Sequence, residues 1–133
     1  MGFATARVSA TRAAASVPLG ALAPLLPSLD ATGIDLLARA RDALLDRAAG
    51  RPMLLFVDDA HLLDEASAML VHQLATDANL FVVATVRNGE PVPDPVIALW
   101  KDGHAERVEI EPLGEDECDR LLAVALGGPV EGA

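Results

Sequence analysis

Two neighbouring carboxylates, Asp58 and Asp59, directly follow a run of apolar residues, "MLLFV". Carboxylates at the end of a buried strand are costly unless a nearby cation or hydrogen-bond donor needs their negative charge. The next apolar run along the chain ends in the same way with polar residues, Thr85, Arg87 and Asn88. If both runs are neighbouring parallel strands, the acids and this basic, hydrogen-bonding set face one crevice, because ligands bind outside the carboxyl ends of such strands.

These residue types suit a nucleotide with its magnesium ion. The carboxylate of Asp58 could hold Mg²⁺ directly or through water. Asp59 could orient or deprotonate an attacking water, and the Arg87 guanidinium or the Thr85 hydroxyl could sense a γ-phosphate. The plainer alternatives are a solvated strand-to-loop turn for the acid pair and a surface ion pair with Glu90 for Arg87. An acid pair alone is a motif of low specificity.

The elements that must position these residues follow from apolar periodicity, which predicts alternating strands and helices. Two of the predicted strands are continuously apolar, and this is typical of strands buried on both faces of a parallel sheet. The expected strands are residues 3–10, 53–57, 80–86 and 105–110; the expected helices are residues 33–49, a segment that Asp64 caps and that runs to about residue 75, residues 94–100 and residues 115–126.

Several stretches carry a resemblance to a known family. "MLLFVDDAH", a helix and then "LFVVATVRNGEP" resemble the Walker B and sensor strands of P-loop ATPases. With "VSATRAAASVPLGALAPLLP", "LLARARDALL" and "LLAVALGGPV", nearly the whole chain is similar to the ATPase module of large ATP-binding LuxR-type transcriptional regulators, in the AAA/STAND group. The resemblance implies a three-layer, P-loop NTPase-like α/β fold, with residues 1–126 as a partial ATPase domain and residues 127–133 as a flexible tail.

The resemblance also implies roles for individual residues. Asp58 becomes the Mg²⁺ ligand, and Asp59 takes the catalytic place where many relatives have a glutamate. Arg87 becomes the catalytic sensor at the end of its strand. Thr85 beside it is a second candidate for contact with the nucleotide. ATP and Mg²⁺ are the implied cofactors.

One departure from the family pattern concerns the phosphate-binding loop, G-x-x-x-x-G-K-[ST], which the sequence does not contain. That loop supplies backbone N–H groups, a lysine and an Mg²⁺ ligand, and the only lysine here, Lys101, follows no glycine cradle. In the family the loop precedes the strand expected at residues 3–10. The chain is therefore expected to lack the first, central strand, which would lie between the strands at residues 80–86 and 105–110, and to bind ATP weakly or not at all by itself.

In a second interpretation, the chain descends from such an ATPase module but has lost the ATPase activity. In it the chain is a degenerate protein-interaction module, or a relic without nucleotide binding, whose exposed leucines favour self-association. A receiver domain fits poorly, because the later predicted strands do not end in the required aspartate and lysine. His72 and His104 share no ligand spacing, so no zinc site is predicted from them. His61, which follows the acid pair, is a secondary candidate for contact with a nucleotide or another subunit.

Composition limits the classes of protein and of binding partner that fit this chain. The 133 residues are 52% hydrophobic and 23% charged, as expected for one globular domain. A net charge of -10 argues against contact with nucleic acid or an anionic membrane. No apolar run approaches the ~18 residues of a membrane span. The single cysteine, Cys118, is expected in a helix core and is consistent with a reducing cytoplasm.

Overall fold

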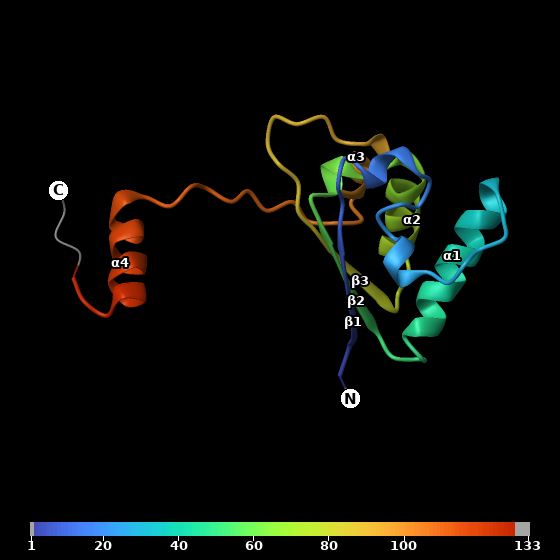
Figure 1. The fold of residues 1–133 in the computed structure, drawn as a ribbon, viewed down its shortest axis with the longest axis horizontal. Helices are drawn as coiled ribbons and strands as arrows, with labels where there is room; N and C mark the ends of the chain where they lie inside the picture. Colours follow the sequence, from blue (N-terminus) through green and yellow to red (C-terminus); the bar gives the residue numbers. More distant parts are fainter. Residues whose placement is uncertain (1, 130–133) are drawn as a thin grey trace.

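The computed structural model describes residues 2–129 and shows an α/β fold on a three-stranded parallel sheet (Figure 1). The strands lie in sequence order and each pairs in parallel with the next, so the two predicted strands that end in the candidate residues are neighbours. All three correspond to predicted strands, although the third ends two residues early. The strands are β1 (Ala4–Ser9), β2 (Met53–Asp58) and β3 (Leu80–Ala84).

Four α-helices within the described residues confirm the predicted helices to within a few residues at each end. Asp64 caps the second helix as predicted, since its carboxylate accepts a hydrogen bond from the backbone N–H of Ser67. Gly127 ends the fourth in a left-handed conformation, φ 73°. The helices are α1 (Gly33–Arg47), α2 (Glu65–Ala75), α3 (Asp94–Lys101) and α4 (Glu115–Leu126), with short 3-10 turns η1 (Ala14–Ser16), η2 (Ala23–Leu25) and η3 (Ala60–Leu62).

The hydrophobic core lies between one face of the sheet and the helices that pack on it, with residues from α1, α2 and α3. Figure 1 shows α1 and α2 on one side of the strands. Leu55 of β2 lies in register with Ala6 of β1 and Val82 of β3, so these side chains share that face. The largest fully buried side chains are Leu22, Leu44, Met53, Leu55, Leu70, Leu74, Val57, Val71 and Val96.

The opposite face of the sheet is not covered by any helix within the described residues. Arg7, Phe56 and Val83 are in register on this face, and Phe81 beside them is 63% exposed. We call Leu54, Phe56, Phe81 and Val83 the bare face. The prediction that β2 and β3 are buried on both faces is therefore wrong here, and the described residues form two layers where three were expected.

The segment after α3 also differs from the sequence prediction. Residues 105–110 form no strand, because a strand needs a partner ladder and none of the described strands lies beside this segment. Its side chains make local contacts instead: Arg107 pairs with Glu109, and Glu109 accepts a hydrogen bond of 3.0 Å from Asn88. The segment leads away from the body of the fold to α4 (Figure 1).

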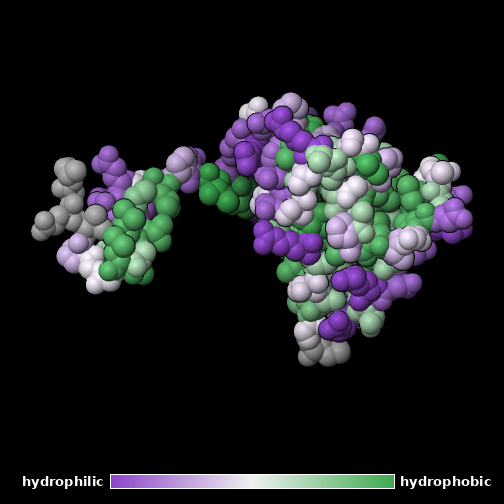
Figure 2. Space-filling model, viewed as in Figure 1, coloured by the Kyte–Doolittle hydropathy of each residue, from purple (hydrophilic) through white to green (hydrophobic). Residues whose placement is uncertain are grey.

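Helix α4 packs against none of the other helices or strands in Figure 1. Its apolar side chains, among them Leu121 and Leu122, are exposed, and green atoms gather on this helix in Figure 2. Cys118 is exposed as well, so its predicted core position is wrong. Of the predicted tail, residues 130–133 lie outside the described residues. In the part of the chain that the structure describes, no helix combines the length and apolar character that crossing a membrane requires.

Candidate functional site

The acid pair lies where β2 ends, beside the end of β3. Thr85, directly after β3, donates a hydrogen bond of 2.7 Å from its Oγ1 to Oδ1 of Asp58. The same Oγ1 accepts a bond of 2.9 Å from the backbone N–H of Asp59. Parallel pairing of β2 and β3 makes these contacts possible, because it brings the carboxyl ends of both strands to one edge. The predicted juxtaposition of Asp58, Asp59 and Thr85 is thus confirmed as geometry.

The Asp58 carboxylate is held in its charged form. Its pKa lies below the ordinary value of 3.8, chiefly because the Thr85 hydroxyl donates to it, while partial desolvation acts in the opposite direction. Arg7 lowers the pKa further, through a hydrogen bond and its positive charge, and the Asp59 N–H also contributes. The side chain is 35% exposed, so solvent reaches an oxygen pair that is already ionised at neutral pH.

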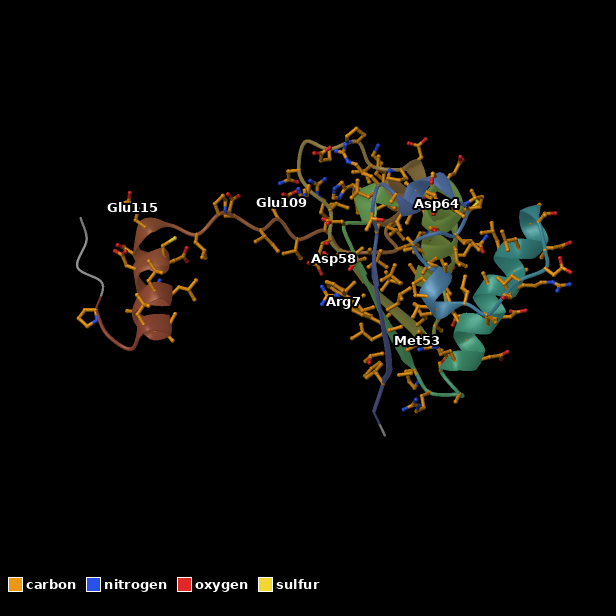
Figure 3. All side chains as sticks on the ribbon, in the orientation of Figure 1. Arg7, Met53, Asp58, Asp64, Glu109 and Glu115 are labelled. Carbon is orange, nitrogen blue, oxygen red and sulfur yellow. The ribbon has the colours of Figure 1, made fainter. Side chains whose placement is uncertain are left out.

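Arg7 is the one residue at this site that sequence reasoning missed. Its Nη2 lies 3.2 Å from Oδ2 of Asp58, and Figure 3 shows the two side chains approaching each other across the edge of the sheet. The guanidinium also lies over the Phe56 ring, 5.2 Å from the centroid. The alternation of residues 3–10 could have placed Arg7 on one face of its strand, but the register of β1 against β2, which sequence does not give, decides which acid it meets.

Asp59 turns the chain from β2 into the 3-10 turn η3. Its backbone is left-handed, with φ 55° and ψ 45°, a conformation that aspartate adopts more readily than most residues. Its Oδ1 lies 3.6 Å from Nε of Arg87, so the predicted catalytic acid and the predicted sensor form an exposed ion pair. The alternative pairing of Arg87 with Glu90 is not among the ion pairs of the described residues.

His61 and Asn88, the remaining candidates from the sequence, lie in different surroundings. His61, in η3, is buried at 8% exposure and its Nδ1 accepts a long hydrogen bond, 3.4 Å, from the backbone N–H of Arg87. It therefore supports the loop that carries Arg87. Asn88 does not join the acids, since it donates to Glu109 in the segment after α3.

The donor set fits one half of a nucleotide site. Carboxylate oxygens are the ligands that Mg²⁺ prefers, and each oxygen of Asp58 keeps a lone pair after its bond to Thr85 or Arg7. A hydrated ion, bound through water, suits this partly exposed edge. The phosphate half is different: the described residues offer no glycine-rich cradle with a lysine, and Lys101 lies at the end of α3.

Comparisons of the chain with protein-family models, with curated proteins and with solved structures gave no match.

Proposed function

We propose that Asp58, Asp59, Thr85 and Arg87 are the magnesium and water side of an ATP site, in a regulatory ATPase module like that of LuxR-type transcriptional regulators. The observation that carries this proposal is the convergence of an acid pair with a hydroxyl and a guanidinium at the carboxyl edge of two parallel strands. That edge is where open α/β sheets bind their ligands. Such a module would work in the cytoplasm, where ATP is plentiful.

Each side chain has a defined task in this proposal. Asp58, kept ionised by Thr85 and Arg7, holds the hydrated magnesium ion. Asp59 accepts hydrogen bonds from the attacking water and orients it, while Arg87 supplies positive charge near the γ-phosphate. Arg87 has to leave its 3.6 Å contact with Asp59 to do so, and an exposed ion pair costs little to separate.

A phosphate cradle has to come from outside residues 1–133, because their sequence contains none. The open edge of β3, where no further strand pairs within the described residues, has room for one more parallel strand. A strand followed by a G-x-x-x-x-G-K-[ST] loop at that edge would bring the loop next to Thr85. The 133-residue chain by itself is expected to bind MgATP weakly or not at all.

The test is a calorimetric titration with MgATP. Residues 1–133 should show no micromolar binding, whereas the same chain preceded by a strand and phosphate loop should bind in the micromolar range. In the extended protein, Asp58→Asn should weaken MgATP binding by about tenfold or more, as loss of a metal-site carboxylate does, and Glu90→Gln in the neighbouring loop should leave it unchanged. Micromolar binding by residues 1–133 would refute the need for an added phosphate loop, and an Asp58→Asn variant that binds normally would sink the proposal that Asp58 holds magnesium.

A second candidate function is self-association without nucleotide. The chain exposes both the bare face and the apolar side of α4, and the segment between them is extended. The first turn of α4 is acidic, with Glu115, Asp116 and Glu117, and Arg7 beside the bare face is 68% exposed although it pairs with Asp58.

In this second candidate, two copies exchange α4 helices, each covering the bare face of the other. Sedimentation analysis should then give a dimer in the absence of nucleotide, and Val124→Asp, on the exposed side of α4, should return it to monomer. A monomer at all concentrations, with or without MgATP, excludes this candidate and leaves the nucleotide proposal standing.

A further inference from the structure

Two histidines and an aspartate, from two segments that lie far apart in the sequence, meet on the helical side of the molecule. His72 lies on α2, and Asp102 and His104 lie in the turn that follows α3. One possible ligand atom from each residue can be chosen so that all three lie within 4.8 Å of one another. The sequence spacing argued against a zinc site, because His72 and His104 are 32 positions apart. Only the packing of α2 against α3 brings them together.

The His72 imidazole has an unusual environment for a polar group. Its Nε2 is buried and has no hydrogen-bond partner among the described residues. Leaving such an atom unpaired is costly, and a buried unpaired nitrogen therefore calls for an explanation. The rings of His72 and His104 pack edge to face, with the centroids 5.4 Å apart and the planes at 89°, so the two imidazoles are direct neighbours.

The turn that carries the other two ligands is held in shape by the backbone. The N–H of Asp102 donates to the carbonyl of Ala98 at 2.9 Å, and the N–H of Ala105 donates to that of Leu99 at 2.8 Å. Between them Gly103 has φ 78°, a left-handed conformation that allows Asp102 and His104 to flank one tight bend. The Asp102 carboxylate makes no ion pair within the described residues.

We propose that His72, Asp102 and His104 bind a zinc-type divalent ion, with water in the fourth position, and that the ion fastens the turn after α3 to α2. Two imidazoles and one carboxylate are a common three-ligand set for zinc, and Mg²⁺ prefers an all-oxygen set. A tetrahedral ion with bonds of about 2.0–2.1 Å needs ligand atoms about 3.3 Å apart. The exposed turn has to close by roughly 1.5 Å at most from the 4.8 Å limit, a movement that side-chain rotation can supply.

This site is separate from the candidate nucleotide site and shares no residue with it. Its position gives it a structural consequence, because the segment that leads to α4 starts from the same turn. An ion at His72, Asp102 and His104 would fix the starting point of that segment on the body of the fold. Binding to the folded chain alone would also raise the unfolding temperature by mass action.

The experiment is a calorimetric titration of the 133-residue chain, free of any histidine tag, with Zn²⁺, supported by visible spectra after addition of Co²⁺. We expect one ion per chain, a tetrahedral Co²⁺ spectrum and a higher unfolding temperature with Zn²⁺. His104→Ala and Asp102→Asn, at exposed positions where folding is not at risk, should each weaken binding at least tenfold. Glu106→Gln removes an exposed acid two residues from His104 and should bind like the parent chain.

Two results would overturn the proposal. One is the absence of Zn²⁺ binding by the parent chain. The other is binding that His104→Ala leaves intact, because the ion would then sit elsewhere on this acidic protein. His72→Ala tests the buried ligand, and its far-ultraviolet circular dichroism decides whether lost binding reflects the ligand or the fold.

Discussion

Asp64 joins two segments that are 45 residues apart in sequence, and this makes it the sharpest test of the packing. Its Oδ2 accepts hydrogen bonds of 3.0 Å from the backbone N–H groups of both Leu19 and Ser67, and its Oδ1 accepts from the Ser67 hydroxyl. Leu19 and Ser67 are both buried. One carboxylate therefore caps α2 and fixes the loop between β1 and α1.

The variant Asp64→Ala should lose both functions. Removing the N-cap bond to Ser67 costs about 1 kcal/mol, and leaving the buried N–H of Leu19 unpaired costs about 1–3 kcal/mol more. We expect the free energy of unfolding to fall by about 2–4 kcal/mol, which is roughly 10–25 °C in melting temperature for a folded body of this size. Asp64→Asn keeps a capping oxygen and should lose about half as much.

The measurement is urea unfolding followed by circular dichroism and by the fluorescence of Trp100, the single tryptophan. The matched control is Asp35→Ala, which removes an exposed acid from the first turn of α1 and should change the free energy of unfolding by no more than about 0.5 kcal/mol. If Asp64→Ala unfolds at the urea concentration of the parent chain, Asp64 does not connect the loop to α2, and the reasoning is refuted.

Two further predictions test the site and the sheet. Thr85→Val should raise the pKa of Asp58, measured by NMR, whereas Thr85→Ser should not, because the hydroxyl is the main group that holds the folded pKa below 3.8. The stabilisation linked to Asp58 is present above pH 3.8 and is lost as the pH falls through the folded pKa. An unchanged pKa of Asp58 in the valine variant would contradict the assignment. Leu55→Ala, on the covered face of β2, should lower the free energy of unfolding by about 2–5 kcal/mol, whereas Phe81→Ala on the bare face should change it by about 0.5 kcal/mol or less; equal losses in urea unfolding would show that both faces are covered.

Local signals in the sequence were sufficient for much of the fold. The alternation of apolar runs with amphipathic stretches predicted the three strands and four helices, because burial periodicity and capping residues act over a few neighbouring positions. Asp64 as a cap and Gly127 as a stop are examples. The order of "MLLFVDD" and "VVATVR" also predicted that Asp58 and Thr85 meet, since consecutive parallel strands end at one edge.

Register and packing were beyond the reach of those signals. Arg7 meets Asp58 only because of how β1 aligns with β2, and His72 meets His104 only because α2 packs against α3. The continuous apolar runs of β2 and β3 suggested burial on both faces, yet Phe81 is solvated. Apolar residues favour burial, but they are buried only where another segment packs against that face. For the same reason residues 105–110 have the composition of a strand and no strand beside them. The sequence by itself determined the three strands, the four helices and the candidate site residues. The tertiary structure alone decided which of those residues meet and which faces are covered, since both depend on contacts between segments distant in the chain.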